Sequence, residues 1–453
     1  MKPRLHSHCA AWACRSVLLW WVATLGAGLA AGQPAELGQQ LNELRKQNEL
    51  MQQQLRQQQE LIERLNRKVA TLETATSHLT NEAPVAPPPP EAEARKEGLS
   101  FSPLRIGNTV LSGEAGVALF HSGSRGQSPN TEFRVDEAKL FLEAQVWRDV
   151  FFFTELNLAQ REDQEDYFRL GELYVEAEGL LKPLGHERLL NLRVGRLDIP
   201  FGEDYLRRDA IDNPLISHSL SDLWGVDEGV ELYGSAGRFQ YVLAVQNGGR
   251  PVLRDYDADK AVVGRLGYDP AKWLHLSVSG MRTGNLNVAD DKMSELWFGN
   301  GFVRALGPAA TTTTFGAELV EGDAQWRWKR GHLATAGGYL HSHDNDRAAP
   351  HPREVYYYYV EGIHYATEKL YGAARVSQIF SPRGFPLVGN GSFGNYFFRE
   401  LTKDLWRVSL GGGYRWSPHF VVKAEYTFNG GETLSGASRP GEDFLAVEAA
   451  VGF

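Results

Sequence analysis

Two short clusters in the sequence combine residue types that could perform chemistry. His218 and Ser219 are adjacent, and a histidine beside a serine could supply the base and the nucleophile of a hydrolase. No acid–base constellation surrounds the pair at a meaningful spacing. We therefore keep a hydrolase as an alternative and expect the protein not to be an enzyme.

The second cluster is rich in histidine and aspartate and could bind a metal ion. His341, His343, Asp344 and Asp346 lie close together, and His351 follows. Residues at i and i+2 share one face of a strand, so such ligands could converge. A loop of this composition is more commonly just solvated. We therefore assign no metal and expect no cofactor.

The remaining chemistry is electrostatic, because charged residues alternate with apolar ones along many segments. In 403–416, for example, Arg407 and Arg415 share one face, and Trp406 and Leu410 lie on the other. The bases on such polar faces are Lys139, Arg193, Arg265, Arg375, Arg407, Arg415 and Lys423. The acids are Glu137, Glu143, Glu155, Glu172, Glu176 and Glu178. Acids gather in the earlier segments and bases in the later ones, which predicts a field across the enclosed space. Pairing between neighbouring strands is the alternative.

Alternating segments of this kind predict a transmembrane antiparallel β-barrel of about sixteen strands. The last segment, 444–453, alternates and ends in Phe453, as is usual for a barrel of a bacterial outer membrane. Short connections alternate with long ones, and tryptophans lie beside the short ones. One strand breaks the pattern, since Phe315 and Leu319 are odd whereas Trp326 and Trp328 are even. If all four face lipid, a bulge near Gly322 is required.

The longest early connection, residues 198–226, is more apolar than an external loop should be. Such a segment would bury itself, and the wall of the barrel interior is the available surface. There it would narrow the pore, with Arg207, Arg208, Asp209 and Asp212 at the narrowest point. The alternative is an external loop packed at a subunit interface.

The residues before the barrel divide into three parts. Residues 1–32 read as a secretory signal peptide, with basic residues followed by an apolar run that ends in small residues. Residues 33–80 carry leucine-rich heptads and predict an α-helical coiled coil, hence self-association. Residues 81–98 include four consecutive prolines and predict a semi-rigid linker. The barrel then occupies 99–453.

Composition excludes several classes of protein. The formal net charge of −9 argues against a nucleic-acid partner. Both cysteines, Cys9 and Cys14, lie in the signal peptide, so the mature chain would have neither thiol catalysis nor disulfides.

The segment from Arg193 to Gly202, RVGRLDIPFG, resembles the G-R-x-x-x-P-F-G element of the phosphate-selective porin O and P family. A signal peptide, a coiled coil, a proline-rich linker, about sixteen strands and a terminal Phe extend the resemblance over the chain. The resemblance implies trimers with one pore per subunit and a third loop folded inward. In the namesake members the constriction is rich in Arg and Lys and passes anions. This chain departs from them, because 198–226 contains no lysine and several acids.

Together these features predict a channel for passive diffusion of small hydrophilic solutes in the Gram-negative outer membrane. Anions are the expected solutes, and phosphate selectivity is doubtful. The expected partners are outer-membrane lipid and further copies of the chain in a trimer, with the coiled coil in the periplasm as a candidate ligand of peptidoglycan. The alternatives are an outer-membrane hydrolase and a structural or anchoring barrel.

Overall fold

The structure is a computed structural model of the chain. It describes residues 103–126, 128–160, 168–223, 225–248, 259–287, 311–346, 350–384 and 402–453. The chain divides into two units, Met1–Arg95 and Lys96–Phe453, and every described residue belongs to the second. The predicted signal peptide, coiled coil and linker therefore lie outside the described residues.

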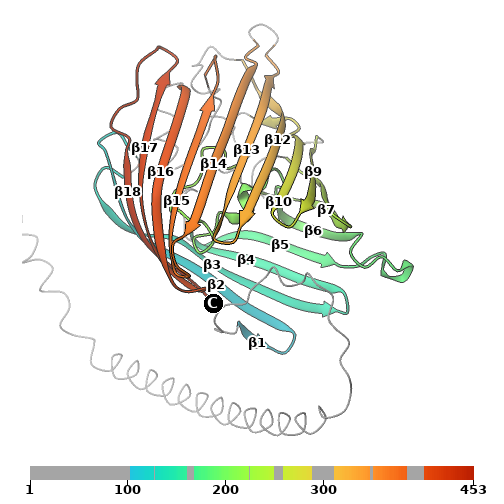
Figure 1. Cartoon of the computed structure of the whole chain (residues 1–453). Helices are drawn as coiled ribbons and strands as arrows, with labels where there is room; N and C mark the ends of the chain where they lie inside the picture. Colours follow the sequence, from blue (N-terminus) through green and yellow to red (C-terminus); the bar gives the residue numbers. More distant parts are fainter. Residues whose placement is uncertain are drawn as a thin grey trace, which may run out of the picture. The chain divides into compact units, whose positions relative to one another are not determined.

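The described residues form one antiparallel sheet that closes on itself (Figure 1). Sixteen long strands make the ring, and β18 closes it by pairing with β2 from Phe444↔Ser122 to Gly452↔Glu114. The strands are β1 (Leu104–Ile106), β2 (Thr109–Ser122), β3 (Glu132–Trp147), β4 (Val150–Gln160), β5 (Arg169–Ala177), β6 (Asn191–Asp198), β7 (Val226–Ala236), β8 (Phe239–Gln246), β9 (Ala261–Ala271), β10 (Leu274–Arg282), β11 (Leu286–Asn287), β12 (Thr314–Trp328), β13 (Gly331–Asp344), β14 (Arg353–Tyr365), β15 (Leu370–Phe380), β16 (Thr402–Ser417), β17 (Phe420–Thr433) and β18 (Phe444–Gly452). The short β1 and β11 only extend the pairing of β2 and β12. The prediction of an all-β barrel of about sixteen strands is confirmed.

Helix is confined to two short 3₁₀ turns in the described part of the chain, η1 (Lys182–Leu184) and η2 (Asp204–Arg207). Among the described residues, no helix has the length and apolar character needed to cross a bilayer.

Alternation along the strands gives the barrel two chemically different faces. In β16, Trp406 and Leu410 are exposed on the outside, whereas Arg407 and Ser409 are buried inside. The same sorting holds in the neighbouring β17, where Tyr426 is outside and the side chains on either side of it are inside. The tryptophans beside the short turns are exposed on the outer surface; they are Trp147, Trp273, Trp326, Trp328 and Trp416. The outside is thus apolar and the inside polar, as the alternation predicted.

The bulge predicted near Gly322 is wrong. All of β12 lies in the described part of the chain, and it pairs with β10 and β13 without a register shift. Phe315 and Leu319 therefore face the interior of the barrel with the other odd residues of β12, and both are buried. The prediction failed because it assumed that every large apolar side chain faces lipid, whereas Phe315 and Leu319 belong to a buried cluster that includes apolar residues of the segment between β6 and β7.

Candidate functional site

The segment between β6 and β7 packs against the inner wall of the barrel. Its Ile199, Phe201 and Leu220 belong to one buried cluster with Phe315 and Leu319 of β12. Further along, Leu215 packs with side chains of β14, β15 and β17, and Ile216 with side chains of β2 and β18. The wall residues in these clusters come from strands on several sides of the interior (Figure 1). Burial of these apolar side chains favours the packed position, because each would otherwise face water.

The motif that opens this segment has glycines where side chains would not fit. Gly195 in β6 has φ 148°, and an added Cβ would lie 2.2 Å from the carbonyl oxygen of Leu173. Gly202 has φ 66°, in the left-handed region, and its Cβ would lie 2.2 Å from Glu321 Oε1. The N–H of Gly202 donates to Ser279 Oγ at 3.1 Å. The motif therefore sets the place where the chain leaves the wall and turns inward.

Lys423 binds the backbone of the segment at three positions. Its Nζ, on the inner face of β17, donates to the carbonyl oxygens of Ala210 at 2.7 Å, Leu215 at 2.9 Å and Asn213 at 3.2 Å. The same Nζ lies 2.8 Å from Glu448 Oε2 of β18, and both side chains are 1% exposed. A lysine has three donor hydrogens, and the three carbonyl oxygens occupy them all, so Glu448 balances the ammonium charge as a close ion pair.

Three arginines hold other carbonyl groups of the segment. Arg375 donates from Nη1 to the carbonyl oxygen of Ser217 at 2.6 Å and pairs with Glu361 of β14. Arg407 donates to the carbonyl oxygen of His218 at 2.9 Å. Arg415 donates to the carbonyl oxygen of Ile211 at 3.0 Å. Each guanidinium replaces the water that these carbonyl groups would otherwise bind.

Glu425 of β17 is the acceptor that complements these donors. Its Oε2 accepts the N–H of Ile216 at 2.5 Å and that of Ser217 at 2.7 Å, and its Oε1 accepts the Ser217 hydroxyl. These are charge-assisted hydrogen bonds in a buried setting. No sequence signal predicts these tethers, because nothing in the local pattern marks which inward charge binds the backbone of another segment.

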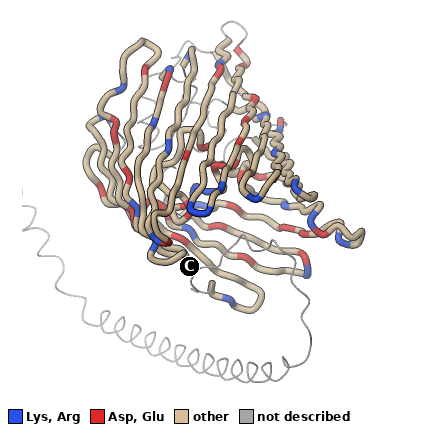
Figure 2. Tube along the Cα trace, viewed as in Figure 1, with Lys and Arg blue, Asp and Glu red and all other residues tan. Residues whose placement is uncertain are grey.

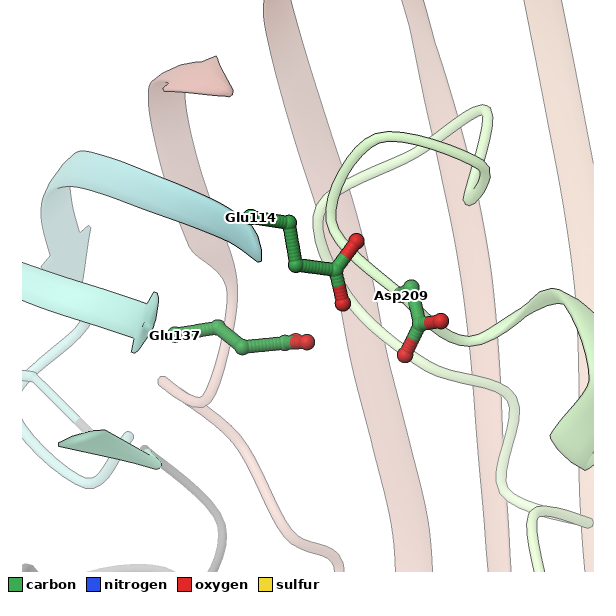
Figure 3. A group of neighbouring side chains, drawn as sticks. All are labelled: Glu114, Glu137 and Asp209. Carbon is green, nitrogen blue, oxygen red and sulfur yellow. The ribbon is translucent and has the colours of Figure 1, made fainter. Parts of the chain in front are cut away.

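A second anchor joins the segment to β2 and β3. Lys139 Nζ lies 2.5 Å from Asp209 Oδ1, 2.7 Å from Glu137 Oε1 and 3.6 Å from Glu114 Oε1. Figure 3 shows Glu114, Glu137 and Asp209 converging from two strands and the loop. Burial alone would raise the pKa of Asp209, but the Lys139 ammonium holds it below its usual value. Among the described residues, these three carboxylates are the one group of three or more His, Cys, Asp or Glu close enough to share a metal ion. Lys139 already supplies a cation there.

The four residues expected at the narrowest point occupy different environments. Arg208 is buried against Asp222, with Nη2 3.2 Å from Oδ2. Arg207 is partly exposed and donates to the Tyr359 hydroxyl at 2.8 Å. Asp209 is bound to Lys139, whereas Asp212 is exposed. Arg207 and Asp212 are thus more accessible to solvent than Arg208.

The two remaining bases lie on β6 and β9. Arg193 is partly exposed between Glu176 and Glu231, at 3.4 and 3.2 Å. Arg265 donates to the carbonyl oxygen of Gly202 at 2.6 Å and to the Tyr205 hydroxyl at 3.1 Å. Pairing across neighbouring strands therefore accounts for much of the inner charge, whose two signs are spread over the strands in Figure 2.

The two clusters with catalytic or metal-binding potential have other contacts. Ser219 donates to Asp204 Oδ2 at 2.5 Å, and His218 Nδ1 lies 3.2 Å from Asp222 Oδ2, so serine and histidine each contact a different carboxylate. In the second cluster, His351 Nδ1 lies 3.0 Å from Asp344 Oδ2. Asp346 accepts the hydroxyl of Thr311 at 2.7 Å.

A closed antiparallel barrel of sixteen strands with a polar interior is the architecture of outer-membrane porins. The structure is similar to that of the outer-membrane channel DcaP of Acinetobacter baumannii, with a TM-score of 0.52 and 13% sequence identity over 76% of this chain and 97% of that chain. It is also similar to outer-membrane expressed OmpT of Vibrio cholerae, with a TM-score of 0.50 and 11% identity over 78% of this chain and 100% of that chain. An in-vitro folded trimer form of OmpT matches with a TM-score of 0.50 and 11% identity over 76% of this chain and 99% of that chain. No protein-family model and no curated protein matches the sequence. At these identities the similarity shows the fold.

Proposed function

We propose that the protein is an outer-membrane channel for the passive diffusion of small hydrophilic solutes. The observation that carries this proposal is the closed ring of sixteen strands with an apolar outside and a charged inside. Lipid would contact the outer face, and water would fill the part of the interior that the inward segment leaves free. A ring of sixteen strands is wide enough to hold an aqueous channel.

The segment 198–226 is the proposed constriction of this channel. It is fastened to the wall by Lys423, Arg375, Arg407 and Glu425, so it would keep its place while solutes pass. Charges that remain accessible at such a constriction set the barriers for ions. We propose Arg207, which is partly exposed and lies 3.8 Å from Glu361, as the base that solutes meet there, and we assign Arg208, which is buried against Asp222, to holding the segment.

The anion preference expected from the inward bases depends on how many of them are free to meet a solute. Arg375, Arg407 and Lys423 are each less than 10% exposed and bind backbone or carboxylate. Phosphate selectivity of the kind found in the phosphate-selective porin O and P family is therefore not part of the proposal. The resemblance at Arg193–Gly202 supports only that this chain and that family turn a loop into the barrel in the same way.

Trimers in the outer membrane are part of the same proposal. The resemblance at the sequence level supports this assembly, as does the trimer form recorded for OmpT of Vibrio cholerae. The predicted coiled coil would then lie in the periplasm, where it could contact peptidoglycan.

Single-channel recording in a planar bilayer tests the proposal. Purified full-length protein should insert in discrete current steps that persist at both polarities. A silent protein that nevertheless inserts would contradict the proposal and favour an anchoring barrel. An assay with ester and peptide substrates, in wild type and in Ser219→Ala, checks the hydrolase: activity lost in the variant would support it.

A further inference from the structure

Aromatic side chains follow one another across the inner wall from β3 to β7. The rings of Phe141 and Phe153 are stacked with centroids 6.2 Å apart, and those of Phe153 and Tyr174 with centroids 5.0 Å apart. The guanidinium of Arg193 then lies over the ring of Tyr174 at 5.0 Å and over that of Tyr233 at 4.6 Å. We call this row of four rings and one arginine the aromatic strip.

The aromatic strip faces the interior. Tyr174 is buried between Leu173 and Val175, which are exposed on the outside of β5. The segment 198–226 is held mainly by other strands, namely β9, β10 and β14–β17, together with Lys139 further along β3. Beside the strip itself, Glu172 of β5 accepts the N–H of Asp198, at the start of the segment, at 3.0 Å. Phe141, Phe153 and Tyr233 are only partly buried, so their rings meet solvent inside the barrel.

Carboxylates outnumber bases around the aromatic strip. On β3–β7, the inward positions next to the rings carry Glu143, Glu155, Glu172, Glu176 and Glu231. One guanidinium, that of Arg193, lies among them and contacts two of the five. The formal excess is four negative charges when all are ionised, and nearby Lys139 is bound by three other carboxylates.

Arg193 shows which chemistry this wall accommodates. A guanidinium lies between two aromatic rings and two carboxylates, which is the environment that a solute cation with a flat or apolar part would need. The bases of the opposite wall add little attraction for anions, since Arg375 and Lys423 are paired with Glu361 and Glu448. Clefts lined by one sign of charge concentrate the opposite ion.

From this arrangement we infer that the channel prefers cations, and that the aromatic strip with its carboxylates is a binding site for organic cations that carry a guanidinium or ammonium group. This inference rests on the proposed channel function and names the class of solute. It differs from the anion preference expected from the sequence. That expectation counted inward bases without knowing that the segment 198–226 would engage them.

The first experiment is the reversal potential of wild-type protein in a KCl gradient across a planar bilayer. The inference requires the permeability of K⁺ to exceed that of Cl⁻, and a ratio at or below one overturns it. The triple variant Glu143→Gln/Glu172→Gln/Glu178→Gln should move the ratio toward one. Glu178 is included because it is exposed just beyond the end of β5. Glu318→Gln is the matched control, because Glu318 lies on the outer face of β12 and contacts His343 at 3.5 Å.

The second experiment measures block of the K⁺ current by argininamide. Citrullinamide is the comparison, since a neutral urea replaces its guanidinium while the rest of the molecule is alike. The inference requires argininamide to block at lower concentration than citrullinamide. Phe153→Leu, which keeps an apolar side chain but removes the ring, should weaken the block about threefold, the factor of an accessible cation–π contact.

The outcomes distinguish failure of the channel function from failure of the cation-binding site. An absence of current steps in wild type removes the channel itself, and the inference with it. Current steps with equal block by argininamide and citrullinamide leave the channel intact and overturn the binding site. Wild-type measurements decide both points, so they stand even if a variant fails to fold.

Discussion

Replacing Lys423 by methionine should release the middle of the inward segment while leaving the barrel closed. Methionine has similar length but no donor, so the carbonyl groups of Ala210, Asn213 and Leu215 would lose their partner. Glu448 would remain as a buried charge without its cation. Strand pairing of β17 with β16 and β18 uses backbone groups and would not change.

The magnitude follows from the burial of the pair. Removing one partner of a buried ion pair costs about 3–5 kcal/mol, because the other charge is left uncompensated. Loss of donors to carbonyl groups that stay buried adds to this value, and release of the segment into water would reduce it again. We therefore expect a loss of about 3–5 kcal/mol in the free energy of unfolding, together with a larger and noisier single-channel conductance.

Two further variants make the assay specific. Lys403→Met is the matched control, since Lys403 on the neighbouring β16 is partly exposed and contacts Glu432 at 3.5 Å. An exposed pair of this kind contributes about 0–1 kcal/mol. Lys423→Met/Glu448→Gln also removes the unpaired charge of Glu448 and should recover part of the lost free energy of unfolding. Urea unfolding in detergent and bilayer recording are the measurements. If Lys423→Met matched Lys403→Met in both, the tether would not hold the segment.

Three other predictions concern the same segment. Glu425→Ala should destabilise the protein by about 2–6 kcal/mol, because the N–H groups of Ile216 and Ser217 lose their acceptor. Glu425→Gln keeps an acceptor oxygen and should cost less. Equal urea midpoints for the two variants would contradict this prediction. Gly202→Ala should cost about 1–3 kcal/mol more than Gly237→Ala. Both glycines have positive φ, so the backbone strain is shared, but only at Gly202 must the buried Glu321 carboxylate move to admit a Cβ; paired thermal melts measure the difference. The pKa of Asp209 is lowered below 3.8 by Lys139 against the effect of burial, and that of Glu203 below 4.5 by His275 against the effect of burial. The stabilisation that these two ionised carboxylates provide is present above those values and is lost as the pH falls through the folded pKa. Single-channel conductance should therefore be steady from about pH 7 to about pH 5 and become noisy below about pH 4. Noise that begins at about pH 6 would contradict the role of these two anchors.

The strands were predictable because each is in contact with two different environments. Over 406–410 of β16 and 422–428 of β17, apolar side chains face out and polar ones face in, so the face and register of these stretches follow from the pattern alone. Leu405 and Val421, just before them, are apolar but buried inside. In β12 the same reasoning failed at Phe315 and Leu319. Their environment is apolar on the inner side as well, and an apolar side chain carries no information about which apolar surface it meets.

The inward charges were predictable as inward, but their partners were not. Arg375 and Lys423 stand at polar positions of their strands, which the alternation identifies. Each of them binds the backbone of 198–226 through a contact between residues more than 150 positions apart, Arg375 with Ser217 and Lys423 with Ala210. No local pattern encodes such a contact. The sequence therefore indicated a charged interior without showing which charges meet solvent.

The sequence separation of these contacts has a consequence for the order of folding. Ile216 must find Glu425, which follows it by 209 residues, and Leu220 must find Ser377, which follows it by 157. Such distant pairings form late, because a long stretch of chain must be ordered before they can stabilise anything. The segment 198–226 therefore lacks these contacts until β15 and β17 have formed. Ile216 packs with residues of β2 and β18, the two strands whose pairing closes the barrel, so this contact of the segment forms only when the ring itself closes.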